Sequence, residues 1–154
     1  MDMATTVRNL ATTDEEAWHR LWAGYCEFYG VDMPAEVTAS TWQRLNDSQE
    51  PTFFGLVAER EGEVIGIANC ILHGTTWAIA PRCYLNDLFV APAARGSGAG
   101  KALIEHLQHI GAEQGWDKIH WLTAESNATA RRLYDQFAPA TEFRQYAILP
   151  KERA

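Results

Sequence analysis

Three glycines at alternate positions separate an apolar stretch from a helix-like stretch, in the run Arg95-Gly96-Ser97-Gly98-Ala99-Gly100-Lys101. Residues 84–90 before this run are typical of a strand, and Leu103, Leu107 and Ile110 after it recur at helical spacing. Glycine lets the backbone approach a ligand closely, and the N–H groups at a helix N-terminus bind anions, phosphates above all. The run, called here the glycine corner, therefore predicts a phosphate-binding site.

Two familiar phosphate motifs do not fit the spacing of the glycine corner. A P-loop needs Gly six positions before its Lys and Ser or Thr after it, but the chain has Arg95 and Ala102 there. A dinucleotide fingerprint needs a third Gly three positions after Gly98, where the chain has Lys101. A plain turn between strand and helix is the remaining alternative. Three glycines with flanking Arg and Lys favour ligand binding over that alternative.

A second spaced motif follows on the next predicted helix, where Asn127, Ala130 and Tyr134 stand three and four residues apart. With the glycine corner, this motif resembles the GNAT superfamily of acyl-CoA-dependent N-acetyltransferases. The stretch Tyr84-Leu85-Asn86-Asp87-Leu88-Phe89-Val90 is similar to the spermidine/spermine and histone/polyamine acetyltransferase branch. The chain departs from that branch at Asn86, where those enzymes carry a glutamate proposed as the base.

The resemblance implies that acetyl-CoA is the co-substrate and that no metal takes part. The corner N–H groups would bind the pyrophosphate, with added charge from Arg95 and Lys101, and the strand before the corner would line the pantetheine. Asn127 would both cap its helix and bind the pantetheine. The implied cofactor-binding residues are Leu88, Phe89, Val90, Arg95, Gly96, Ser97, Gly98, Ala99, Gly100, Lys101, Asn127 and Ala130.

Acetyl transfer to an amine needs proton movement off the amine and onto the departing thiolate. By resemblance, Tyr134 is the general acid, because an unperturbed phenol has a pKa of about 10 and stays protonated at neutral pH. Asp87 is the candidate base, although it can equally bind the cationic amine or satisfy backbone groups at a bulge. His73 and His120 are weaker candidates for the base.

The acceptor site of this family is shaped by the first helix and the loop after it. Tyr25, Glu27 and Tyr29 are therefore expected to contact the acceptor, together with Asn86, which can position a water but cannot accept a proton. The aromatic character of this segment favours a small primary amine, such as a polyamine or an amino acid. A protein lysine or N-terminal acetyltransferase, and a CoA-binding regulatory module without turnover, are the alternatives.

Composition narrows the class of protein. The 154 residues are 47% hydrophobic, which predicts a single domain over residues 1–154. A net charge of −7 argues against nucleic acid as a partner. The three cysteines lack metal-ligand spacing, and no apolar run is long enough to cross a membrane. We expect a cytoplasmic protein, and the family resemblance allows a homodimer.

The elements that must position these residues follow from hydrophobic periodicity and turn residues. Strands are predicted at 5–9, 53–59, 64–72, 83–90, 118–123 and 141–149, with a loop over 73–82. Helices are predicted to about residue 29 from a capping box of Thr13 and Glu16, over 35–45, from the glycine corner to Gly115, and after Asn127. The crossover from 83–90 to 118–123 makes those strands parallel. The expected α/β (α+β) fold has a mixed, mostly antiparallel sheet with helices on both faces.

Overall fold

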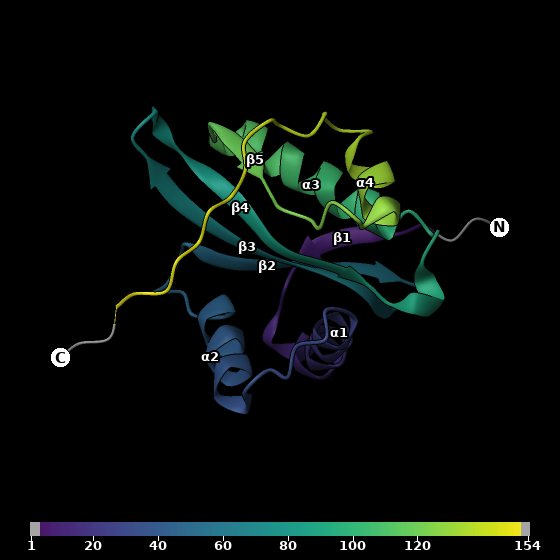
Figure 1. The fold of residues 1–154 in the computed structure, drawn as a ribbon. Coiled ribbons are helices and arrows are strands. Elements are labelled where there is room, and N and C mark those ends of the chain that lie inside the picture. The colour runs from purple at the N-terminus through teal and green to yellow at the C-terminus, as the bar shows by residue number, and fades with distance from the viewer. Residues whose placement is uncertain (1–3, 152–154) are drawn as a thin grey trace. The chain divides into compact units, whose positions relative to one another are not determined.

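The computed structural model describes residues 4–151, and the chain forms two compact units, Met1–Leu122 and Thr123–Ala154. The first unit contains a five-stranded sheet in the order β1-β2-β3-β4-β5 (Figure 1). All neighbouring strands are antiparallel except β4 and β5, which are parallel, so the predicted mixed sheet is confirmed. The strands are β1 (Thr6–Asn9), β2 (Phe53–Arg60), β3 (Glu63–Thr75), β4 (Ala78–Val90) and β5 (Lys118–His120).

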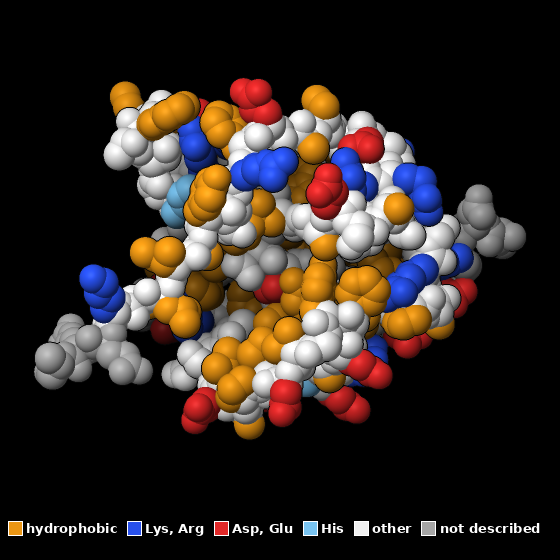
Figure 2. All heavy atoms as spheres, in the orientation of Figure 1, with side chains coloured by type: hydrophobic (Ala, Val, Ile, Leu, Met, Phe, Trp, Pro, Cys, Tyr) orange, Lys and Arg blue, Asp and Glu red, His pale blue; other side chains and the backbone are white. Residues whose placement is uncertain are grey.

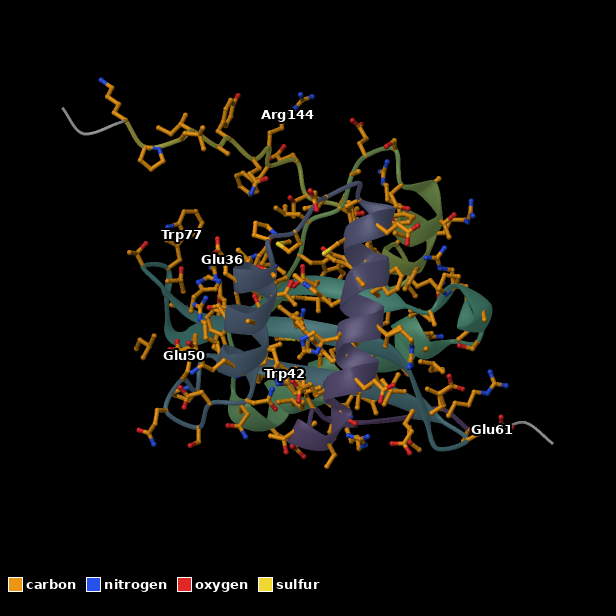
Figure 3. All side chains as sticks on the ribbon, turned by 90° about the horizontal axis from the view of Figure 1, so that it is seen from below. Glu36, Trp42, Glu50, Glu61, Trp77 and Arg144 are labelled. Carbon is orange, nitrogen blue, oxygen red and sulfur yellow. The ribbon has the colours of Figure 1, made fainter. Side chains whose placement is uncertain are left out.

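Helices cover both faces of this sheet, as predicted. Helices α1 (Glu15–Phe28) and α2 (Ala35–Leu45) lie across the strands on one face, as the view from below shows (Figure 3). The apolar side chains of α1 recur every three or four residues, so they form one stripe that packs against the sheet. This core contains Trp18, Leu21, Trp22, Cys26, Leu45, Val57, Val64, Ile67 and Phe89.

Helix α3 (Ala99–Gln114) packs on the opposite face of the sheet. Its Leu103, Ile104 and Leu107 are almost completely buried, which agrees with the helical spacing in the sequence. The helix ends at Gly115, whose φ of 73° is the left-handed conformation that favours glycine at this position. The predicted end of the helix is therefore confirmed.

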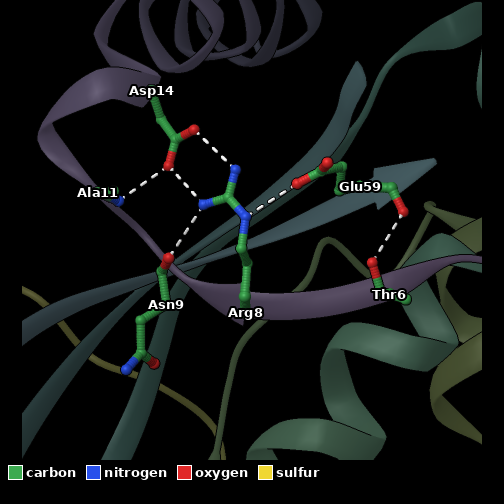
Figure 4. Close-up of polar contacts among 6 residues, drawn as sticks. All are labelled: Thr6, Arg8, Asn9, Ala11, Asp14 and Glu59. Atoms are coloured by element: carbon green, nitrogen blue, oxygen red, sulfur yellow. Dashed lines mark hydrogen bonds and ion pairs between the residues drawn. The ribbon is translucent and has the colours of Figure 1, made fainter. Parts of the chain in front are cut away.

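The start of α1 differs from the predicted capping box of Thr13 and Glu16. Residues Thr12–Asp14 form a 3₁₀ turn, and Asp14 is the residue before the helix. Asp14 Oδ2 accepts hydrogen bonds from the Ala11 N–H (2.8 Å) and from Arg8 Nη1 (2.8 Å), as Figure 4 shows. Arg8 Nε also donates to Glu59 Oε2 at 2.9 Å. Asp14 thus ties β1 and β2 to the start of α1 through Arg8, which the local capping pattern did not anticipate.

Replacing Asp14 by Asn is expected to lower the free energy of unfolding by about 1–2 kcal/mol at pH 7, because a buried charged hydrogen bond is lost. The hydrogen bonds from Arg8 hold the pKa of Asp14 below its ordinary value. The stabilisation is therefore present above the unfolded pKa and disappears as pH falls below about 4. Urea unfolding at pH 7 and pH 3 measures this difference. Asp32→Asn, at an exposed position, is the control, and an equal loss in both variants would contradict the assignment.

Two predicted boundaries around β4 are wrong. The predicted loop over 73–82 is instead a continuation of the β3–β4 hairpin, in which His73 pairs with Arg82 and Thr75 with Ala78. Trp77, at the end of this hairpin (Figure 3), is 83% exposed. The ladder continues because antiparallel pairing is carried by backbone hydrogen bonds, even where side chains do not alternate. The strand predicted over 118–123 ends at His120.

The second unit contains one short helix, α4 (Ala128–Tyr134), within its described residues. The strand predicted over 141–149 is wrong, since this segment has no regular secondary structure and is not paired with any strand that the structure describes. Its apolar side chains are exposed, with Phe143 at 80%, Tyr146 at 90% and Ile148 at 93%. Alternating apolar residues predict a strand, but the strand forms only where a partner supplies backbone hydrogen bonds.

Among the helices in residues 4–151, none combines the length and the apolar character that a membrane crossing demands.

Candidate functional site

Strand β4 carries a bulge at Asn86. In the β3–β4 ladder Asn69 is opposite Asp87 and Cys70 is opposite Leu85, so Asn86 is the extra residue. A bulge bends its strand and redirects the side chains beside it. Asn86 is exposed here, while Asp87 is turned inward and is only 8% exposed.

The carboxylate of Asp87 is fixed by a chain of hydrogen bonds from three elements. Trp18 Nε1 on α1 donates to Asn69 Oδ1 on β3 (3.0 Å), and Asn69 Nδ2 donates to Asp87 Oδ2 (3.1 Å). Asn86 Nδ2 donates to Asp87 Oδ1 at 3.1 Å. Because Asn69 bonds to both α1 and Asp87, Asp87 lies on the face of the sheet that α1 covers. Each carboxylate oxygen has one donor and keeps further acceptor capacity for a ligand.

The edge of β4 next to β5 becomes free just beside this carboxylate. The parallel ladder ends at the pair Tyr84 and His120, where β5 stops, whereas β4 continues to Val90. Within the described part of the first unit, residues 85–90 therefore have no strand on this side. Such an edge presents backbone N–H and C=O groups that can pair with an extended ligand. Leu88, Phe89 and Val90, predicted to line the pantetheine, belong to this edge.

The glycine corner follows β4 and leads into α3. Gly96 and Gly98 have φ values of 83° and 85°, and Gly98 is the residue before the helix. The first bond inside the helix runs from the Ala102 N–H to the Gly98 carbonyl (2.9 Å), so the earlier N–H groups have no partner within the helix. A β-carbon at Gly96 or Gly98 would meet no atom within 4 Å, so space is open above this backbone.

The corner also holds a buried hydroxyl that the described residues do not satisfy. Ser97 Oγ is buried and accepts or donates no hydrogen bond among the residues that the structure describes. An unsatisfied buried hydroxyl is costly, and a phosphate oxygen is an acceptor that would satisfy it. The N–H groups without a helix partner and this hydroxyl together fit a phosphate-bearing cofactor.

Two basic residues flank the corner. The Arg95 guanidinium lies 5.6 Å from the ring centroids of both Phe28 on α1 and Phe89 on β4. These rings hold the positive charge of Arg95 at the end of β4. Lys101 Nζ lies 3.9 Å from Glu105 on the exposed surface of α3, so it is less firmly placed.

The predicted acceptor residues separate into two groups on α1. Tyr25 faces the sheet, with its ring 6.2 Å from Phe89 and 4.9 Å from Tyr29. Glu27 is exposed and is not part of this aromatic group. Hydrophobic side chains cover much of the α1 and α2 surface in view, with acidic side chains along its margin (Figure 2). Tyr25 and Tyr29 thus form an aromatic surface on the side of the sheet that carries Asp87.

In the second unit, Asn127 caps α4 as predicted, because its Oδ1 accepts a hydrogen bond from the Ala130 N–H at 3.3 Å. Asn127, Ala130 and Tyr134 are three and seven residues apart, so they lie along one face of this helix. Tyr134 is the last residue of α4 and is half-buried. Its role as general acid stays a prediction.

Sequence reasoning missed Asn69 and gave little weight to His73 and His120. His73 Nε2 and His120 Nε2 are 2.7 Å apart, and the ring of His120 lies 4.9 Å from that of Tyr84. Burial, the neighbouring His73 and the cations Arg82 and Lys118 hold the pKa of His120 below its ordinary value. A strand through residues 73–82 would have pointed to a contact between His73 and His120, but the sequence predicted a loop there.

No group of three or more His, Cys, Asp or Glu residues that could hold a metal ion occurs in residues 4–151.

Comparisons with known proteins agree with this geometry. The model of the acetyltransferase (GNAT) family matches residues 15–138. A D-amino-acid N-acetyltransferase of Saccharomyces cerevisiae is 35% identical, over 88% of this chain and 85% of the relative. An uncharacterised N-acetyltransferase of Bacillus subtilis is 31% identical, over 92% of this chain and 95% of the relative. An aminoglycoside N-acetyltransferase solved in complex with CoA is similar in fold, with a TM-score of 0.77 and 18% identity, over all of this chain and 98% of that chain.

Proposed function

Because this chain belongs to the acetyltransferase (GNAT) family, we propose that it moves an acetyl group from acetyl-CoA to the primary amine of a small molecule by direct transfer in a ternary complex. The observation that carries the proposal is the fixed carboxylate of Asp87 beside the free edge of β4. The carboxylate binds a cationic amine, and the free edge of β4 pairs with the extended acetyl-CoA. Both functions would belong to a single domain over residues 1–154.

The donor is held by the glycine corner and by the edge of β4. The N–H groups of Ala99, Gly100 and Lys101 and the hydroxyl of Ser97 bind the pyrophosphate. Arg95 adds positive charge to the same region. The backbone of residues 88–90 pairs with the pantetheine as with an added strand. Asn127 and Ala130, on the matching family motif, contact the pantetheine from α4. When bound, acetyl-CoA supplies the activated acetyl group as a thioester.

Two residues act on the acceptor and on the leaving group. Asp87 binds the acceptor ammonium through the carboxylate lone pairs that do not accept a hydrogen bond from Asn69 or Asn86. A backbone N–H beside the bulge at Asn86 faces the thioester carbonyl oxygen and stabilises the charge that develops there. Tyr134 donates its phenolic proton to the departing thiolate.

A small acceptor suits the aromatic surface of Tyr25 and Tyr29 near Asp87. Two proteins similar to this chain carry names that specify small amine acceptors, a D-amino acid in one and an aminoglycoside in the other. The stretch before the glycine corner is similar to the polyamine branch, with Asn86 in place of its glutamate. An amino acid and a polyamine are therefore the first acceptors to test.

A panel of four amines tests this function: D-alanine, L-alanine, spermidine and sisomicin. Release of free thiol from acetyl-CoA measures turnover with each amine, and mass spectrometry identifies the acetylated product. Turnover with at least one of these amines is expected. Stabilisation by acetyl-CoA without turnover would favour the regulatory module. Turnover only with a lysine-containing peptide, assayed beside the four amines, would favour the protein acetyltransferase.

The same assay with Asp87→Asn tests the acceptor site. Asn keeps the size of the side chain but removes its charge, so KM for the amine should rise about tenfold or more, by the 1.5–3 kcal/mol of a charged hydrogen bond. The acetyl-CoA Kd should stay unchanged. Asp135→Asn, at an exposed position after α4, is the control. An unchanged KM in Asp87→Asn would remove Asp87 from the acceptor site.

A further inference from the structure

The paired imidazoles of His73 and His120 lie on the same face of the sheet as Asp87. On β3, Asn69, Ile71 and His73 alternate, so their side chains share one face, which Asn69 identifies as the face covered by α1. His120 on β5 reaches the same face, because its Nε2 lies 2.7 Å from His73 Nε2 and its ring stacks near Tyr84.

The position of His120 along the sheet places it where the edge of β4 becomes free. Tyr84 and His120 form the last pair of the parallel ladder, and the bulge at Asn86 follows two residues later on β4. Tyr84 is opposite Ile71 and Asp87 is opposite Asn69, so the side chains of Tyr84 and Asp87 follow one another along this face of β4. His120 therefore lies at the start of the free edge on which the proposed function places the thioester.

The hydrogen bonds define which ring nitrogens carry protons. His73 Nδ1 lies 2.8 Å from the Gly74 carbonyl oxygen, and since a carbonyl only accepts, His73 Nδ1 is the donor. In neutral His73 the other nitrogen, Nε2, must then accept, so His120 Nε2 donates across the 2.7 Å contact. His120 Nδ1 is left with a lone pair and has no hydrogen-bond partner among residues 4–122.

Burial and the charged groups around this pair favour neutral His120 at pH 7. Burial lowers the pKa of His120 most, followed by His73 and by the cations Arg82 on β4 and Lys118 on β5. Arg82 is itself paired with Asp117, at 2.7 Å. On β4, burial raises the pKa of Tyr84, so its phenol stays protonated and does not compete as a base. Asp87 is the remaining acidic group of β4 on this face.

We propose that His120 is the base of the acetyl transfer and that His73 is a positioning residue that receives the relayed proton; this rests on the proposed function. The acceptor ammonium first releases one proton to water, and the neutral amine nitrogen then bonds to the acetyl carbon and becomes positively charged. Its N–H bond then breaks, and the proton goes to His120 Nδ1 while the proton on His120 Nε2 moves to His73 Nε2. The C–S bond breaks with its electron pair on sulfur, and the thiolate takes the proton of Tyr134.

In this arrangement His120 removes the proton and Asp87 holds the amine. The proton leaves the nitrogen only after bonding has made it acidic, so a neutral imidazole is a strong enough base. The resulting positive charge lies on His73, where the Gly74 carbonyl accepts from its Nδ1–H. Asp87 is then free to hold the amine rather than to remove its proton, which explains how the site functions with Asn86 in place of a glutamate.

Three variants test the relay with the panel amine that has the highest kcat/KM. His120→Gln keeps a donor toward His73 but has no base, so kcat should fall about a hundredfold, within the range of general-base effects. His73→Gln keeps an acceptor for His120 but cannot take the proton, so kcat should fall by less. His109→Gln, on the exposed surface of α3 with Glu113 as its partner, is the control and should keep wild-type kcat.

The pH profile distinguishes a base from a merely structural side chain. In the wild-type protein, kcat should rise with pH through an apparent pKa below about 6.5, as His120 loses its proton. That limb should disappear in His120→Gln, with KM for acetyl-CoA unchanged. If His120→Gln keeps the wild-type kcat and the wild-type rise of kcat with pH, the relay is wrong and the proposed function still stands. Failure of the wild-type protein to acetylate any panel amine would overturn the proposed function as well.

Nitrogen NMR of the wild-type imidazoles provides a readout without turnover. Long-range nitrogen–proton couplings at pH 7.5 should show His73 protonated at Nδ1 and His120 protonated at Nε2. The opposite tautomer in His120, with its proton on Nδ1, would leave no lone pair for the amine proton and would overturn the relay. The measurement needs no variant, so it does not depend on how His120→Gln folds.

Discussion

Tyr134→Phe is expected to lower kcat by about a hundredfold, because a general acid typically contributes 10²–10⁴-fold to rate. Phe keeps the ring of Tyr134 at the end of α4 and removes only the hydroxyl. The acetyl-CoA Kd should therefore stay unchanged, since the phenolic proton matters only when the thiolate departs. Thiol release at saturating acetyl-CoA measures kcat, and calorimetric titration measures the Kd.

The control for this prediction is Tyr146→Phe, because Tyr146 belongs to the second unit and is 90% exposed. It should keep the wild-type kcat. A leaving group that is a weaker base than the CoA thiolate needs less help from an acid, so an acetyl thioester of a more acidic thiol should show a smaller loss in Tyr134→Phe. Equal losses with both thioesters, or no loss with acetyl-CoA, would remove Tyr134 from the proton transfer.

The parts of the site that depend on local chemistry were predictable from the sequence. The glycine corner could be identified because left-handed φ values at Gly96 and Gly98 require residues without a β-carbon. Asn127 could be identified as a helix cap because the cap joins atoms only three residues apart. The parallel pairing of β4 with β5 followed from the crossover connection between them.

The parts that depend on strand register were not predictable. Asn69 and Asp87 are 18 residues apart, and His73 and His120 are 47 apart. Their contacts follow from the bulge at Asn86 and from the end of β5, and both features depend on tertiary pairing rather than on local residue types. The predicted strand over 141–149 failed for the related reason that alternation specifies a face but does not supply a partner.

Gly98→Val is expected to weaken acetyl-CoA binding by about a hundredfold, or about 2.8 kcal/mol. Gly98 has a φ of 85°, and a β-branched residue is strongly disfavoured there. To relieve that strain the backbone must turn toward negative φ, which redirects the N–H groups of residues 98–101 away from a bound phosphate. Because those N–H groups bind the donor before any chemistry occurs, the loss should appear in the acetyl-CoA Kd and should leave the pH profile of kcat at saturation unchanged.

The matched control lies at the other end of the same helix. Gly115 has a φ of 73°, and a β-carbon there would also meet no atom within 4 Å. Gly115→Val should therefore strain α3 about as much as Gly98→Val, so thermal unfolding without ligand should show similar losses of Tm in the two variants. Only Gly98→Val should lose the rise in Tm that acetyl-CoA gives the wild-type protein. If both variants lose that rise equally, the effect comes from a weakened helix, and the glycine corner is not the phosphate site.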